Sequence, residues 1–172
     1  MPFKLHEQMA YECMLVRDII RYVLLVYWPD INWTPSGIFV DQDSDSPFNS
    51  IVQRSVKKYL DIYGWMINEK YYEHFNERKF SAKKHCEICR EIIENQNNFA
   101  DGRIVVFGLC SILSYITALS VSRGIRAAPR ISHVLILGYF PILRNRGLIG
   151  DTFWEDFQNL CLEFSINHTG KD

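Results

Sequence analysis

The stretch IVVFGLCSILSYITALSVS, residues 104–122, decides the fold class of this chain. It contains no charged side chain and lies between Arg103 and Arg123. Its length suits either a helix buried at the centre of a bundle or a helix that crosses a membrane. Small and hydroxylated residues within it weaken insertion into lipid, which favours the buried helix: Gly108, Ser111, Ser114, Thr117 and Ser120.

Helical patterns also precede this stretch. Apolar residues recur at steps of three and four over residues 11–28, and Pro29 ends that pattern. Residues 29–50 contain prolines and an acidic run, and we predict a loop there. The following pattern, residues 51–80, fits one irregular helix or two short ones, and residues 82–95 form a helix with a buried stripe.

Two more helices are expected after the uncharged stretch. A second apolar segment covers residues 131–143 and ends in Phe140-Pro141. A glycine turn at residues 147–150 then leads to a last helix from about Asp151 to Phe164. No strand pattern and no internal repeat is visible, so we predict an all-α protein.

Composition limits the class of protein. With 172 residues, 48% of them hydrophobic, the chain suffices for one domain over residues 1–172 with a single core. The net charge is -1, and the basic residues form no stripe along the sequence, so nucleic acid is not an expected partner. The five cysteines fall mostly within apolar helical patterns, which suits free thiols in the cytoplasm, and no signal peptide is recognisable.

No catalytic or metal-binding motif stands out. Cys86 and Cys89, beside His85, have the spacing of zinc sites and redox dithiols, but they lack a second ligand pair and a preceding strand. Residues three apart simply share one face of a helix. His133, on an apolar face, is expected to be a core residue. We therefore expect no enzyme activity, no cofactor and no metal.

Asp101-Gly102-Arg103 begins the uncharged helix and is the most informative polar motif. Asp101 is suited to cap the helix, and Gly102 allows another backbone to come close. Arg103 is a cation in the first turn, against the helix dipole, and therefore needs an anionic partner. The pattern does not decide whether this partner is Asp101, a nearby glutamate or a ligand. Arg103 could also extend into solvent at the edge of a membrane.

Four segments, in order, resemble the homology regions of the Bcl-2 family. Gly102-Arg103-Ile104-Val105-Val106-Phe107 is similar to the first region, written Asn-Trp-Gly-Arg followed by hydrophobic residues. Phe140-Pro141-Ile142-Leu143, with the glycine turn and Asp151-Thr152-Phe153-Trp154 after it, resembles the second. Residues 52–63 and 12–22 resemble the third and the fourth regions. The predicted loop also falls where the family keeps its long loop.

This resemblance implies a bundle of about eight helices around a central hydrophobic helical hairpin, with a groove that binds an amphipathic helix. In that groove Arg103 would pair with the ligand's aspartate, and Gly102 would admit the ligand's backbone. The remaining expected lining is apolar: Tyr59, Tyr63, Ile88, Ile92, Val106 and Phe157, with Val52, Val56, Tyr71, Phe75 and Phe107 as further contacts.

The departures from the family pattern suggest a pro-survival member. Ala100-Asp101 replaces Asn-Trp, so Asp101 would compete for Arg103 and narrow the range of ligands. Lys57 stands where the third region has its aspartate, which makes this chain's own helix a poor killer ligand. The chain resembles the shortened viral members, such as those of iridoviruses and other large DNA viruses, and would inhibit apoptosis in the host cytoplasm by sequestering BH-3 helices.

The sequence is also compatible with several alternatives. A small membrane protein could use residues 104–122 and 131–143 as a helical hairpin. The chain ends at Gly170-Lys171-Asp172 without a hydrophobic tail, so no stable membrane anchor is expected, although peripheral contact with mitochondria is compatible with the sequence. An unfilled apolar groove would also allow a homodimer.

Overall fold

The protein is all-helical, as predicted. The computed structural model describes residues 4–27, 33–75 and 79–167, and within them it contains no strand. Two short 3₁₀ helices, η1 (Gly37–Val40) and η2 (Gln96–Asn98), accompany the α-helices. The α-helices are α1 (Leu5–Tyr27), α2 (Ser50–Phe75), α3 (Ala82–Asn95), α4 (Gly102–Ser122), α5 (Ala128–Asn145) and α6 (Phe153–Asn167).

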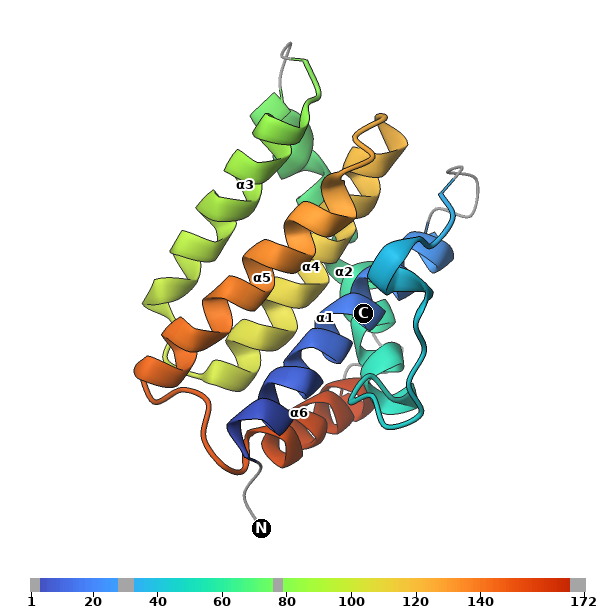
Figure 1. Cartoon of the computed structure of the whole chain (residues 1–172). Helices are drawn as coiled ribbons and strands as arrows, with labels where there is room; N and C mark the ends of the chain where they lie inside the picture. Colours follow the sequence, from blue (N-terminus) through green and yellow to red (C-terminus); the bar gives the residue numbers. More distant parts are fainter. Residues whose placement is uncertain (1–3, 28–32, 76–78, 168–172) are drawn as a thin grey trace.

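The uncharged stretch is α4, and it forms the centre of the bundle. It contacts α1, α2, α3, α5 and α6, and Figure 1 shows α4 and α5 as an antiparallel pair between α3 and α1. Among the described residues, α4 is the one helix long and apolar enough to cross a membrane, but 72% of its most apolar window is buried inside the bundle. Its position at the centre of the core accounts for its composition.

Some element boundaries differ from the predicted ones. The α1 helix begins at Leu5, earlier than expected, and its predicted end at Pro29 lies outside the described residues. The α2 helix is continuous over 26 residues, which resolves the choice between one helix and two up to Phe75. The α5 helix runs through Pro141 to Asn145. Pro141 is exposed, so solvent can hydrate the helix carbonyl left without its N–H partner.

The predicted loop is held against α1 by a charged network. Arg17 forms an ion pair with Asp43, with Nη2 3.1 Å from Oδ2. The Ser46 hydroxyl donates to the Asp18 carboxylate at 2.6 Å, and Arg17 and Asp18 are themselves nearly buried. The described part of the loop, residues 33–49, is therefore attached along the α1 surface (Figure 1).

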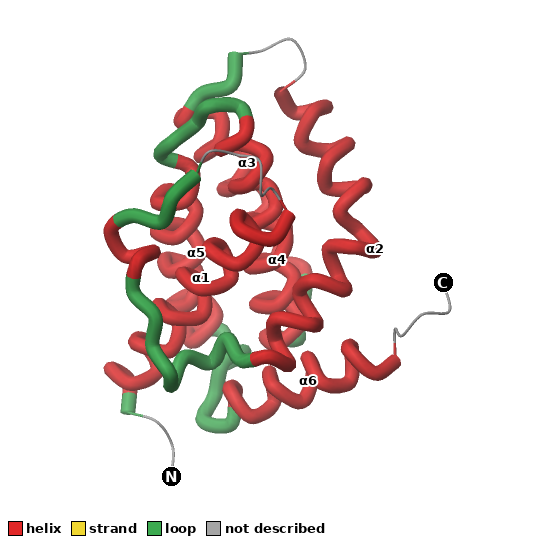
Figure 2. The backbone as a smooth tube through the Cα atoms, turned by 90° about the vertical axis from the view of Figure 1, so that its right-hand side faces the viewer, coloured by secondary structure: helices red, strands yellow, loops and turns green. Residues whose placement is uncertain are grey.

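The α6 helix covers one end of the bundle. It contacts α2 and α4, and Figure 2 shows it crossing beneath the lower end of α2. Phe157 is fully buried there, and the Ser55 hydroxyl of α2 donates to the Cys161 carbonyl at 2.6 Å. All five cysteines lie in described residues as free thiols, and Cys89, Cys110 and Cys161 are buried.

Candidate functional site

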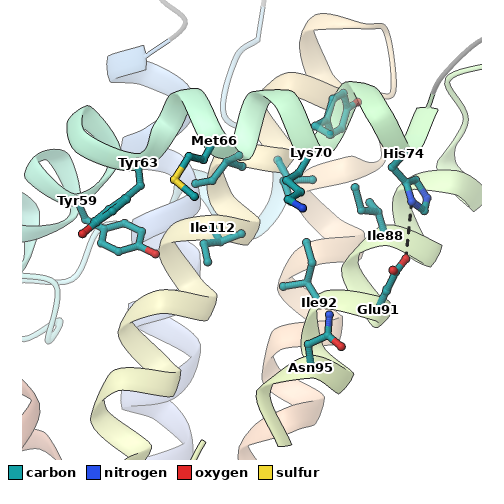
Figure 3. A pocket seen from close by; sticks show the side chains of 13 residues that line it. Tyr59, Tyr63, Met66, Lys70, His74, Ile88, Glu91, Ile92, Asn95 and Ile112 are labelled. Carbon is teal, nitrogen blue, oxygen red and sulfur yellow. Dashed lines mark ion pairs between the residues drawn. The ribbon is translucent and has the colours of Figure 1, made fainter. Parts of the chain in front are cut away.

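An open apolar groove lies between α2, α3 and α4. It has a volume of about 440 Å³, and Figure 3 shows the side chains that line it. The α2 helix forms one wall, α3 the other, and α4 contributes Ile112 and Ile116 from below. The remaining lining residues are Tyr59, Tyr63, Met66, Ile67, Lys70, Tyr71, His74, Ile88, Glu91, Ile92 and Asn95.

The groove wall on α2 follows one face of a continuous helix. Tyr59, Tyr63, Met66, Lys70 and His74 recur at steps of three and four. Such steps place side chains above one another on one face. From Tyr59 to His74 this wall extends over about 22 Å at the rise of an α-helix. The groove is thus long enough to accommodate several turns of a second helix.

The groove has a closed floor and an exposed mouth. Tyr71, Ile88 and Ile116 are buried, whereas Tyr63 keeps 37% and Met66 43% of its surface accessible. Exposed apolar side chains gathered in one hollow are a typical feature of a binding surface. The groove therefore presents an apolar surface to solvent.

Besides its tyrosines, the groove lining contains three ionisable residues, Lys70, His74 and Glu91. His74 of α2 faces Glu91 of α3, with His74 Nδ1 3.7 Å from Glu91 Oε2, and this contact joins the two walls near one end (Figure 3). Lys70 lies in the middle of the wall and is exposed. Within the described part of the chain, Lys70 has no ion-pair partner.

Five of the predicted site residues line this groove. Tyr59 and Tyr63 form one end, Tyr71 and Ile88 lie at the floor, and Ile92 stands on the α3 wall. Six other apolar predictions lie within the core and do not line the groove: Val52, Val56, Phe75, Val106, Phe107 and Phe157. Each is at most 7% exposed.

Arg103 and Gly102 lie in a separate shallow hollow beside the turn that follows α5. The Arg103 guanidinium pairs with Asp101, with Nη2 2.9 Å from Oδ2 and Nε 3.2 Å from Oδ1. This hydrogen bonding holds the pKa of the Asp101 carboxyl below its usual range and raises the pKa of Arg103. Of the partners that the sequence left open, Asp101 is the one present.

The space beside Gly102 is occupied by the chain's own backbone. A Cβ built on Gly102 would lie 2.1 Å from the carbonyl oxygen of Leu148, in the turn between α5 and α6. The close approach expected from the sequence is therefore real, and the backbone that makes it belongs to residues 146–150. The hollow around Arg103 thus differs from the open groove predicted at this position.

Sequence reasoning missed eight residues of the groove, half of them on the second half of α2. They are Met66, Ile67, Lys70 and His74, together with Glu91 and Asn95 of α3 and Ile112 and Ile116 of α4. The available signal was the step pattern that begins at Tyr59. It was not followed because the continuity of α2 beyond residue 63 was unresolved from the sequence.

A buried polar cluster lies behind the groove and joins four helices. His85 of α3 is fully buried, with Nδ1 2.7 Å from Ser120 Oγ and Nε2 2.8 Å from Ser132 Oγ. The Tyr71 hydroxyl lies 2.9 Å from the same Ser120 oxygen. Cys89 contacts this cluster, and burial raises the pKa of its thiol to about 12. The cysteine pair singled out in the sequence therefore includes one protonated core thiol.

Asp101→Ala is expected to lower the free energy of unfolding by about 1 kcal/mol, because Asp101 caps α4. Its carboxylate accepts from the Arg103 backbone N–H at 3.0 Å. Urea unfolding measures the change. Asp101→Asn keeps the cap and loses only an exposed ion pair, so it should remain within a few tenths of a kcal/mol of the parent. Equal losses in the two variants would contradict the capping role.

Comparison of this chain with models of protein families, with curated proteins and with solved structures finds no significant match.

Proposed function

We propose that this chain binds an amphipathic helix in the groove between α2, α3 and α4. The observation that carries the proposal is the open apolar hollow itself, walled by two helices and floored by a third. Recognition of this kind uses apolar anchors at i, i+3, i+4 and i+7 of the ligand. A wall of about 22 Å matches that spacing over several turns.

The ordered resemblance to the Bcl-2 homology regions supports a proposal for the class of helix. In this proposal the chain is a pro-survival protein that sequesters BH-3 helices of pro-apoptotic relatives and so inhibits apoptosis. The observed groove supports it because Tyr59, Tyr63, Ile88 and Ile92, which the resemblance nominated, line the hollow together. They come from α2 and α3, which are separate in sequence.

Met66→Glu is expected to weaken binding of Bim-like BH-3 peptides by at least about 30-fold, because it puts a charge among the apolar anchors. Isothermal titration calorimetry of the purified chain against a panel of such peptides measures the effect. The parent should bind at least one peptide more tightly than about 10 μM.

Trp65→Glu is the matched control for this experiment. Trp65 is the preceding residue of α2, is 63% exposed, and does not line the groove. It should bind the peptides like the parent. The proposal fails if the parent binds none of the peptides, or if Met66→Glu and Trp65→Glu reduce binding equally.

A further inference from the structure

The mouth of the groove contains one cation without an ion-pair partner in the described part of the chain. Lys70 lines the groove and reaches from α2 toward Ile92 on α3, between Met66 and His74 (Figure 3). Apart from the tyrosines, the other ionisable residues of this lining are His74 and Glu91, which face each other. A ligand carboxylate placed at Lys70 would therefore gain a partner without displacing an existing pair.

The hollow around Arg103 is more acidic than the groove, whose lining contains one lysine and one glutamate. Its lining contains one basic residue, Arg103, and two acidic ones, Asp101 and Asp156, so its formal charge is 1 − 2 = −1. Asp101 already forms an ion pair with the Arg103 guanidinium. An acidic ligand group entering there would have to displace Asp101 while approaching Asp156, and repulsion between like charges opposes both steps.

We infer that Lys70, in place of Arg103, forms an ion pair with the acidic residue of the helix that binds in this groove. This inference rests on the proposed function and names its specificity determinant. Because apolar lining flanks Lys70 on both sides, with Met66 and Ile67 toward one end and Ile88 toward the other, the acid belongs within the anchored part of the ligand. The partner is thus an amphipathic helix with a carboxylate between its apolar anchors.

A double-mutant cycle tests the pairing of Lys70 with the ligand's acid. Calorimetry would compare the parent, Lys70→Ala and Arg103→Ala against one BH-3 peptide and against the same peptide with its aspartate replaced by alanine. Lys70→Ala should weaken binding of the acidic peptide about tenfold and leave the alanine peptide unaffected. Arg103→Ala should bind both peptides within about twofold of the parent.

A charge swap separates this pairing from a general effect of removing the lysine. Lys70→Glu should bind a peptide with lysine in place of the aspartate better than it binds the original peptide. Lys70 is exposed, so these variants should keep the parent's thermal midpoint.

The inference is overturned if replacing the peptide's aspartate costs the same affinity in the parent and in Lys70→Ala. In that outcome peptide binding persists and the proposed function stands. Failure of the parent to bind any peptide would instead remove the proposed function, and this inference with it.

Discussion

Gly102→Ala should lower the free energy of unfolding by about 3 kcal/mol and the thermal midpoint by about 10 °C. The new Cβ would lie 2.1 Å from the Leu148 carbonyl oxygen, a separation that forces backbone to move. The turn that must shift is anchored by the Leu148 N–H, which donates to the Leu143 carbonyl at 2.9 Å. Differential scanning calorimetry or urea unfolding would measure the loss.

Gly108→Ala is the matched control on the same helix. A Cβ at Gly108 meets no atom within 4 Å, and its backbone is helical. Alanine stabilises a helix more than glycine does. The free energy of unfolding of this variant should therefore be equal to that of the parent or up to about 0.5 kcal/mol higher. Similar destabilisation of both variants would mean that Gly102 is needed for a reason other than its contact with Leu148.

The sequence predicted the elements whose periodicity is unbroken. The α3 helix has the predicted limits of residues 82–95, and α4 matches the uncharged stretch extended by two residues at its start. The α2 helix was harder because a polar and aromatic stretch follows its apolar pattern after Tyr63. Gly64, at the start of that stretch, has a tertiary role, since a Cβ there would lie 3.1 Å from the Tyr115 ring of α4. A contact between distant segments is not readable from local pattern.

The candidate site was predicted only in part, and for a related reason. Periodicity identifies the apolar face of a helix but not the neighbour that covers it. Val56 and Tyr63 both belong to the apolar pattern of α2, yet Val56 is fully buried and Tyr63 remains 37% exposed in the groove. Arg103 was expected in the groove because of a motif, whereas the turn around Leu148 closes over the residue before it.

The two wall helices of the groove differ in how they are fixed to the core. The α3 helix is attached to α4 and α5 through the His85 hydrogen bonds and through Ile88, while α2 packs on α4 and α6 and reaches the same polar cluster through the Tyr71 hydroxyl. A ligand that inserts between the walls therefore relies on His85 to hold one of them. The hydrogen bonds of this buried imidazole therefore contribute to the free energy needed to open or distort the groove.

Acidification should destabilise the parent by about 3 kcal/mol through His85 alone as the pH falls from 6.5 to 4. Burial lowers the pKa of His85 from 6.5 to about 4, and its side-chain hydrogen-bond partners are hydroxyls and a thiol. Between these two pKa values the unfolded chain therefore binds a proton at His85, whereas the folded chain does not. This contribution is complete above pH 6.5 and is lost toward pH 4.

Urea unfolding of the parent, His85→Gln and His6→Gln across this pH range isolates the contribution of His85. Carboxylates and the buried ring of His133 also titrate, so the informative quantity is the difference between variants at each pH. His85→Gln carries no titrating ring and should narrow its deficit relative to the parent by about 3 kcal/mol as the pH falls to 4. His6 is exposed, so His6→Gln should follow the parent throughout. A constant gap between the parent and His85→Gln would mean that His85 titrates alike in both states and would contradict the lowered pKa of this buried imidazole.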